Sequence, residues 1–233
     1  AFTRKKSISL LQLLVLRSGS PIDRSTLAER LWPGVDEESG ANRLHGVVHA
    51  LRSVIAPRGA KSWRYVQSDG DRYWFNVDSP HRIDLYRFRK LLGDAALAER
   101  ETRPEAVTAR LEEAVQSYQG DLFSDSADED LFVAERAEVR ERCLTAHKRL
   151  AVLLRDAVEL DRAAHWLRRA LEVDALREDL HQLLIDCLIR CGRRREAVDQ
   201  YWTCVRTLEQ ELGASPLPGT LRLGQVLNLF GAG

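Results

Sequence analysis

The spacing of apolar residues changes from a helical period to a strand period and back, and this change limits the fold more than any other feature. Residues 4–18, 24–32 and 39–55 each carry an apolar stripe at helical spacing, which predicts three amphipathic helices. Residues 63–77 are rich in aromatic and β-branched residues around the turn sequence SDGD, which predicts a β-hairpin. Three helices followed by a hairpin is the element order of a winged helix-turn-helix.

The chain after about residue 82 returns to the helical period. Helices are expected at about residues 83–99, 104–118, 128–158, 161–173, 176–191, 194–212 and 218–229. The pattern around Ala163 recurs around Ala197, and this offset of 34 residues is the period of tetratricopeptide helix pairs, which approach closely at small residues. The predicted fold class is mainly α, with a winged-helix domain over residues 1–78 and an all-helical tetratricopeptide-like domain over residues 79–233.

The net charge of zero conceals an uneven distribution. Residues 1–78 carry 12 Lys and Arg against 8 Asp and Glu, a net of +4, and residues 79–233 carry 23 against 27, a net of −4. A basic first part suits nucleic acid as a partner, whereas an acidic remainder does not. No apolar run approaches the roughly 20 residues that cross a bilayer, and no secretion signal accompanies the four cysteines. A cytoplasmic protein with reduced thiols and no membrane partner is therefore expected.

The helix expected at residues 39–55 has a polar face suited to a DNA groove. One row opposite the apolar stripe, with spacings of 3, 4 and 3, consists of Asn42, His45, His49 and Arg52. A second row of small residues beside it consists of Gly46, Ala50 and Ser53. The first row can donate hydrogen bonds to base edges and phosphates, and the second lets the backbone approach a surface closely. A solvated helix face is the alternative interpretation, but the adjacent turn and hairpin favour a recognition helix in a major groove.

Further candidate sites lie near the ends of other elements. Ser25 and Thr26 open the helix at residues 24–32, whose free backbone N–H groups can hold a phosphate. Arg72 follows the hairpin turn and can enter a minor groove or contact phosphate; a solvated turn charge is the alternative. Cys187 and Cys191 lie four residues apart, but buried structural cysteines are the stronger interpretation, so no metal is predicted. No catalytic constellation or cofactor motif indicates an enzyme.

Several short motifs resemble a known family. Residues 27–33 (LAERLWP), 41–44 (ANRL), 50–52 (ALR) and 70–73 (GDRY) resemble the OmpR-type winged helix in the form found in the Streptomyces antibiotic regulatory protein family. The second part resembles that family's bacterial transcriptional activator domain. The motifs that carry this second resemblance are residues 83–88 (IDLYRF), 118–122 (YQGDL), 134–136 (AER), 170–174 (ALEVD) and 211–216 (ELGASP).

The resemblance implies a DNA-binding transcriptional activator without a cofactor. In the family the third helix of the winged helix reads the major groove, a role that carries over to Asn42, Arg43, His49 and Arg52, while the wing contact carries over to Arg72. Members bind direct repeats upstream of promoters and recruit RNA polymerase holoenzyme. Their helical domain supports self-association. The implied partners are therefore promoter DNA, the polymerase and a second copy in a homodimer, for a protein associated with the nucleoid.

The chain departs from the family pattern at two places. Ala50 stands where the family usually has Arg, and the chain starts at the first helix, without the small antiparallel sheet that precedes it in the family. The absence of Met at position 1 indicates a fragment from which this sheet was removed, unless this member lacks it. The first helix would then need another cover for its apolar face. These departures keep a second hypothesis open, a protein-interaction scaffold whose winged helix no longer reads DNA.

Overall fold

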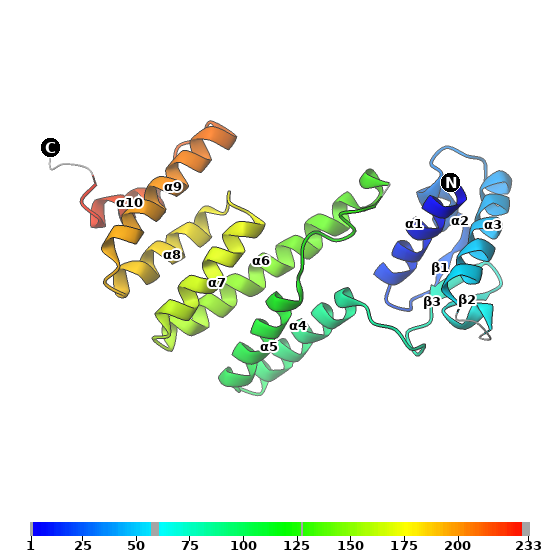
Figure 1. The fold of residues 1–233 in the computed structure, drawn as a ribbon, viewed down its shortest axis with the longest axis horizontal. Helices are drawn as coiled ribbons and strands as arrows, with labels where there is room; N and C mark the ends of the chain where they lie inside the picture. Colours follow the sequence, from blue (N-terminus) through cyan, green and yellow to red (C-terminus); the bar gives the residue numbers. More distant parts are fainter. Residues whose placement is uncertain (1, 57–60, 127, 230–233) are drawn as a thin grey trace. The chain divides into compact units, whose positions relative to one another are not determined.

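The computed structural model describes residues 2–56, 61–126 and 128–229, which fall into two compact units (Figure 1). The first, called the winged-helix unit, is made of residues 1–86 and 121–137, and the second, called the helical unit, is made of residues 87–120 and 138–233. The sequence suggested one boundary after residue 78. The two units instead alternate along the sequence. Residues 121–137, which follow the first part of the helical unit, belong to the winged-helix unit.

The winged-helix unit has the expected order of three helices and a hairpin. Its first elements are α1 (Phe2–Leu16), β1 (Ile22–Asp23), α2 (Arg24–Leu31), α3 (Glu37–Ile55), η1 (Ser62–Arg64), β2 (Val66–Asp69) and β3 (Arg72–Phe75). Two details differ from the prediction. Trp63 lies in the short 3-10 helix η1 and not in a strand, and β1 adds a third strand to the antiparallel sheet, whose order is β1-β3-β2.

The start and the inward face of α3 follow from its sequence. The Asp36 carboxylate accepts a hydrogen bond from the Ser39 N–H at 2.9 Å, which satisfies one of the N–H groups that a helix leaves unpaired at its start. The same hydrogen bond lowers the pKa of Asp36. The predicted apolar stripe is confirmed, because four of its side chains are at most 5% exposed: Leu44, Val47, Val48 and Leu51.

Residues 121–137, called the return segment, complete the winged-helix unit. The return segment contains η2 (Glu129–Phe132) and the start of α6 (Val133–Asp156). Asp128 accepts hydrogen bonds from the Lys6 ammonium at 3.1 Å and from the Ser9 hydroxyl, and the Ser126 hydroxyl donates to Gln12 at 3.2 Å. The return segment is therefore joined to α1 by hydrogen bonds along one side of that helix.

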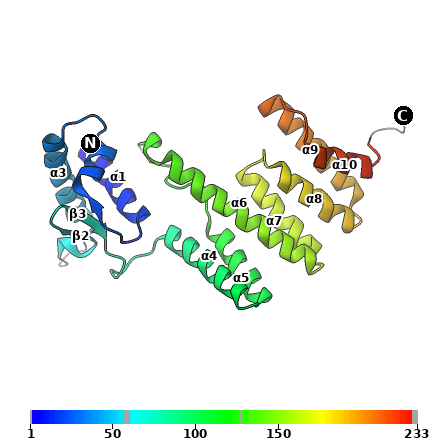
Figure 2. The same cartoon turned by 180° about the vertical axis from the view of Figure 1, so that it is seen from behind.

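The helical unit consists of helices, all of which the sequence predicted. They are α4 (Asp84–Arg100), α5 (Pro104–Ser117), α6, α7 (Leu160–Val173), α8 (Glu178–Arg190), α9 (Arg194–Leu212) and α10 (Pro218–Val226), as both views of the ribbon show (Figures 1 and 2). The helix expected from residue 128 starts at Val133, because η2 precedes it. Ala163 and Ala197, the small residues of the predicted repeat, are fully buried, which agrees with a tetratricopeptide-like packing of helix pairs.

The same turn joins the two helices of three successive pairs, α4–α5, α6–α7 and α8–α9. Thr102, Val158 and Gly192 occupy equivalent positions in these turns and have φ angles of +52°, +63° and +73°. In each turn the next residue donates its N–H to the carbonyl five residues earlier, over 2.8 to 2.9 Å. Val158 and Gly192 are 34 residues apart, so the repeat extends from the sequence to the backbone geometry.

Replacing Val158 by Gly should raise the free energy of unfolding by roughly 0.5–1 kcal/mol. A left-handed conformation strains an L-residue by about 1–2 kcal/mol, and Gly removes this strain at a smaller entropic cost. The Val158 side chain is 77% exposed, so little packing is lost. The converse change, Gly192→Val, should lower the free energy of unfolding, and urea denaturation measures both. A less stable Val158→Gly protein would contradict the proposed equivalence of the two turns.

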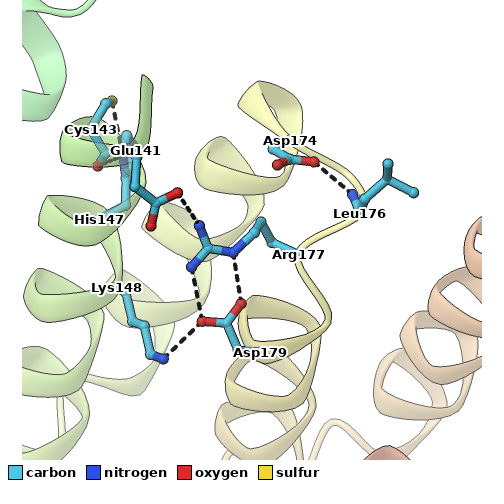
Figure 3. Close-up of polar contacts among 8 residues, drawn as sticks. All are labelled: Glu141, Cys143, His147, Lys148, Asp174, Leu176, Arg177 and Asp179. Atoms are coloured by element: carbon cyan, nitrogen blue, oxygen red, sulfur yellow. Dashed lines mark hydrogen bonds and ion pairs between the residues drawn. The ribbon is translucent and has the colours of Figure 1, made fainter. Parts of the chain in front are cut away.

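A group of charged side chains ties α6 to the start of α8 (Figure 3). The Arg177 guanidinium donates to Glu141 at 2.7 Å and to both oxygens of Asp179, at 3.0 and 3.2 Å. The Lys148 ammonium donates to the same carboxylate at 2.8 Å. Burial by itself would raise the pKa of Asp179, but the hydrogen bonds from Arg177 and Lys148 outweigh it and lower this pKa to about 2.

The stabilisation by Asp179 should therefore disappear in acid. Because the pKa is lower in the folded state than in the unfolded chain, the contribution is complete above pH ~4 and is lost as the pH falls towards 2. The whole difference in pKa between the folded and unfolded states corresponds to roughly 2.4 kcal/mol in the free energy of unfolding. Because the Asp179 side chain is 35% exposed, solvent screening leaves about 1 kcal/mol of this. Urea denaturation of wild type and Asp179→Asn should show this difference at pH 7 and almost none at pH 2. A difference that does not change with pH would contradict the assignment.

Candidate nucleic-acid interface

The outward face of α3 presents polar side chains that point away from the core. Asn42, Arg43, His45 and His49 are all exposed. Within the described ranges, none of these four side chains forms a hydrogen bond or an ion pair with another residue. Their donor groups are therefore available to a ligand that lies along α3. Three of the four residues of the row predicted from the sequence, Asn42, His45 and His49, lie together on this face with Arg43 beside them.

Gly46 leaves the backbone of α3 open in the middle of this face. A Cβ atom built at Gly46 meets no atom within 4 Å, whereas one built at Gly40 lies 3.1 Å from the Cβ of Ala28 in α2. The close packing of α2 against α3 thus explains why a residue without a side chain stands at position 40. Glycine inside a helix costs roughly 0.5–1 kcal/mol relative to alanine, and no packing within the described structure compensates this cost at Gly46.

The Arg52 side chain turns away from the row in which the sequence placed it. Its Nε donates to the Val66 carbonyl at 2.9 Å, and one terminal nitrogen donates to the Ser68 hydroxyl at 2.9 Å. Val66 and Ser68 belong to β2, so the half-buried Arg52 ties the wing to α3. Its structural role is to position the wing, and the free donors of the face are those of the other four residues.

The turn of the hairpin lies beside the start of α2. Arg72 is 56% exposed and pairs loosely with Asp69, at 3.7 Å between nitrogen and oxygen. Arg24 donates its backbone N–H to the Asp71 carbonyl at 2.7 Å, and its guanidinium lies 3.1 Å from the Asp71 carboxylate. The sequence interpretation overlooked Arg24, because β1, which brings the two segments together, is only two residues long.

The first turn of α2 keeps the features of an anion site. Ser25 and Thr26 are exposed, as expected. Asp23 occupies the N-cap position, but its side chain makes no capping hydrogen bond. Apart from the Arg24 N–H, which donates to the Asp71 carbonyl, the backbone N–H groups of this first turn are therefore not satisfied by the capping residue and can face a phosphate oxygen.

Three of the four cysteines lie in packed helices, and Cys191 directly follows the end of α8. Cys143, Cys187 and Cys204 are buried, and Cys191 is partly exposed. Burial raises the pKa of Cys143 and Cys204 to about 12 and that of Cys187 to about 11, which keeps these groups as thiols at neutral pH. Within residues 2–229, apart from the undescribed positions 57–60 and 127, no three His, Cys, Asp or Glu side chains are grouped to hold a metal ion. No helix of that same part is long and apolar enough to cross a membrane.

Comparisons with known proteins find similar transcriptional regulators. RedD, a transcriptional regulator of Streptomyces coelicolor, is 26% identical over 212 residues, which cover 89% of this chain and 59% of RedD. The transcriptional regulatory protein MoaR1 of Mycobacterium tuberculosis is 22% identical over 91% of this chain and 68% of MoaR1. This chain therefore spans less than two thirds of the length of RedD.

A solved structure shares the fold. EmbR of Mycobacterium tuberculosis, in complex with a low-affinity phosphopeptide, matches 96% of this chain and 59% of the EmbR chain with a TM-score of 0.74 and 21% identity. The model of the bacterial transcriptional activator domain matches residues 83–227, more than half of the chain. The family is one of transcriptional regulators and not of enzymes. The chain therefore belongs to the family of the bacterial transcriptional activator domain, with the architecture of a Streptomyces antibiotic regulatory protein-type regulator.

Proposed function

We propose that this protein binds double-stranded DNA through α3 and activates transcription. The observation that carries the proposal is the exposed face of α3. Four donor side chains on it make no hydrogen bond or ion pair with any described residue, and they lie beside the open backbone of Gly46. A major groove admits an α-helix, and its base edges offer acceptors to side chains of these types. Membership in a family of transcriptional regulators supports the same conclusion.

Each candidate residue has a distinct role in this proposal. Asn42, His45 and His49 read base edges, and Arg43 contacts a base or a phosphate. A second group of residues contacts the DNA backbone or supports that contact. The N–H groups at Ser25 and Thr26 hold a phosphate, and Arg72 on the wing reaches a phosphate or the minor groove. Arg52 holds the wing in place. The helical domain supports self-association of two copies on direct repeats of the promoter. The bound protein recruits RNA polymerase holoenzyme to that promoter. It therefore acts at the nucleoid, in the cytoplasm.

Fluorescence anisotropy with duplexes selected from a randomised pool tests DNA binding. Each phosphate contact adds about 0.9 to the slope of log affinity against log salt concentration, so Arg72→Ala should reduce this slope by about 1. Asn42→Ala should instead weaken discrimination between base pairs, by about 1–3 kcal/mol at one position of the site. A protein that binds no duplex even at low salt would rule out the proposal.

A protein-interaction scaffold is the second candidate function. It is favoured by Ala50 and by the orientation of Arg52, because together they leave the middle and the end of α3 without a free guanidinium. A variant with Asn42, Arg43 and His49 all replaced by Ala separates the two functions. The scaffold hypothesis expects promoter activation in cells to persist in this variant, whereas the DNA-binding hypothesis expects it to be lost while the fold is retained.

A further inference from the structure

The helical unit contains a cavity of about 460 Å³ between α4, α5 and α6. Its floor is apolar and is formed by Leu92, Ala95, Leu111 and Ala146. Three of these residues are 2–3% exposed and belong to the continuous core of the unit. The volume lies in the range of sites that take small organic molecules, roughly 300–1,000 Å³, and an apolar floor with a few polar groups is their usual composition.

The polar edge of this cavity is a row of donors on α6. Arg142, Thr145 and Arg149 are spaced 3 and 4 residues apart and therefore share one helix face. Within the described part of the chain, each guanidinium has one carboxylate partner. Arg142 pairs with Glu138 one turn earlier, and both of these side chains are more than half exposed; Arg149 pairs with Glu99. Exposed pairs of this kind contribute little to stability and use only some of the five N–H donors of a guanidinium. Each of these arginines can therefore donate hydrogen bonds to a second anion.

The hydroxyl of Thr145 adds a further donor to the row. Other helical threonines of this unit, Thr108 and Thr203, donate to the carbonyl four residues earlier, at 3.0 and 2.8 Å. The Thr145 hydroxyl makes no hydrogen bond with any described residue. The two carboxylates at the rim, Glu138 and Glu141, are paired with Arg142 and Arg177.

We propose that this cavity binds a small organic anion that has an apolar body. The carboxylate or sulfonate of the ligand accepts hydrogen bonds from Arg142, Thr145 and Arg149, and its rings or alkyl chain lie on the apolar floor. A neutral molecule can fill the floor but leaves the donor row unused. The cavity is confined to α4, α5 and α6, which suits a compact ligand better than an extended peptide.

A matched pair of dyes tests the proposal in the whole chain. The probes are 8-anilinonaphthalene-1-sulfonate and N-phenyl-1-naphthylamine, which have the same ring system with and without a sulfonate. Fluorescence titration should show one site for each dye. The double variant Arg142→Ala, Arg149→Ala should weaken binding of the sulfonate about tenfold or more, because charge-assisted hydrogen bonds are lost, and change binding of the neutral dye less than twofold. The control Arg110→Ala, which removes an exposed arginine of α5 paired with Glu113, should change neither.

Filling the cavity distinguishes this site from nonspecific apolar binding. Thr145→Trp adds a large ring at an exposed edge position, and Ala146→Leu adds atoms at the floor; circular dichroism and the melting temperature show which variants fold. A folded filling variant should lose both dyes. Retention of both dyes in it, or equal loss of the two dyes in the arginine double variant, would overturn the proposal.

Discussion

The Gly46→Leu variant should bind selected duplex DNA at least about 100-fold more weakly than wild type and yet be more stable. In the free protein a Cβ atom built at Gly46 meets no atom within 4 Å, so the substitution should remove the roughly 0.5–1 kcal/mol cost of a helical glycine. In the complex the same side chain would occupy the space between α3 and the groove. His45 and His49 on either side would then lose base contacts of about 1–3 kcal/mol each, and 2.7 kcal/mol corresponds to a 100-fold change in affinity.

Gly93 offers a matched control for this experiment. It is an exposed glycine inside α4, and a Cβ atom built there also meets no atom within 4 Å. Gly93→Leu should therefore give a similar gain in the urea midpoint without a change in anisotropy titrations with DNA. Gly46→Ala, with its smaller side chain, should give an intermediate loss of affinity. Unchanged DNA affinity in a stable Gly46→Leu protein would show that α3 does not lie close against DNA.

Replacing Phe132 by Ala should lower the free energy of unfolding of the winged-helix unit by about 3–5 kcal/mol. Phe132 is fully buried in the return segment and packs edge-on against Phe123 of the same segment, with 5.0 Å between ring centroids. Its loss leaves a cavity where the ring was buried. Hydrogen exchange read by mass spectrometry should show lost protection in peptides from α1 and from the return segment, while peptides from α8 and α9 keep theirs.

A polar contact of the same segment provides the comparison. Arg30 in α2 donates to Glu135 at 2.8 Å and to the Leu131 carbonyl at 2.7 Å. Because the Arg30 and Glu135 side chains are 39% and 23% exposed, Arg30→Ala should cost only about 1 kcal/mol. If Arg30→Ala destabilised the unit more than Phe132→Ala, burial of Phe132 would not be the larger contribution of the return segment to stability.

The local features of this protein could be predicted from its sequence. Apolar periodicity placed every α-helix of the structure within a few residues, and the turn sequence at residues 68–71 placed the hairpin. The exposed face of α3 followed from the same periodicity, because residues that alternate with a buried stripe on one helix must face outwards. The 34-residue offset similarly identified Ala163 and Ala197 as contact positions between helix pairs, and both are buried.

The direction of Arg52 could not be predicted in this way. A helical wheel assigns a residue to a face but does not show what a neighbouring strand offers to its side chain. Residues 14 and 16 positions later, Val66 and Ser68, supply acceptors that turn the guanidinium toward the wing. β1 escaped prediction for a related reason, since a two-residue strand has no period and exists only through its pairing with β3.

The sequence by itself thus determined the helices, the hairpin, the repeat and the face of α3, all of which depend on residues within a few turns of one another. Only the tertiary structure decided that the return segment belongs to the winged-helix unit. Ser9 and Asp128, which join it to α1, are 119 positions apart, and neither residue type is unusual in its local stretch. Such contacts depend on how the intervening helices fold the chain back. The period of apolar residues describes only the local element, so it cannot predict which distant residues come into contact.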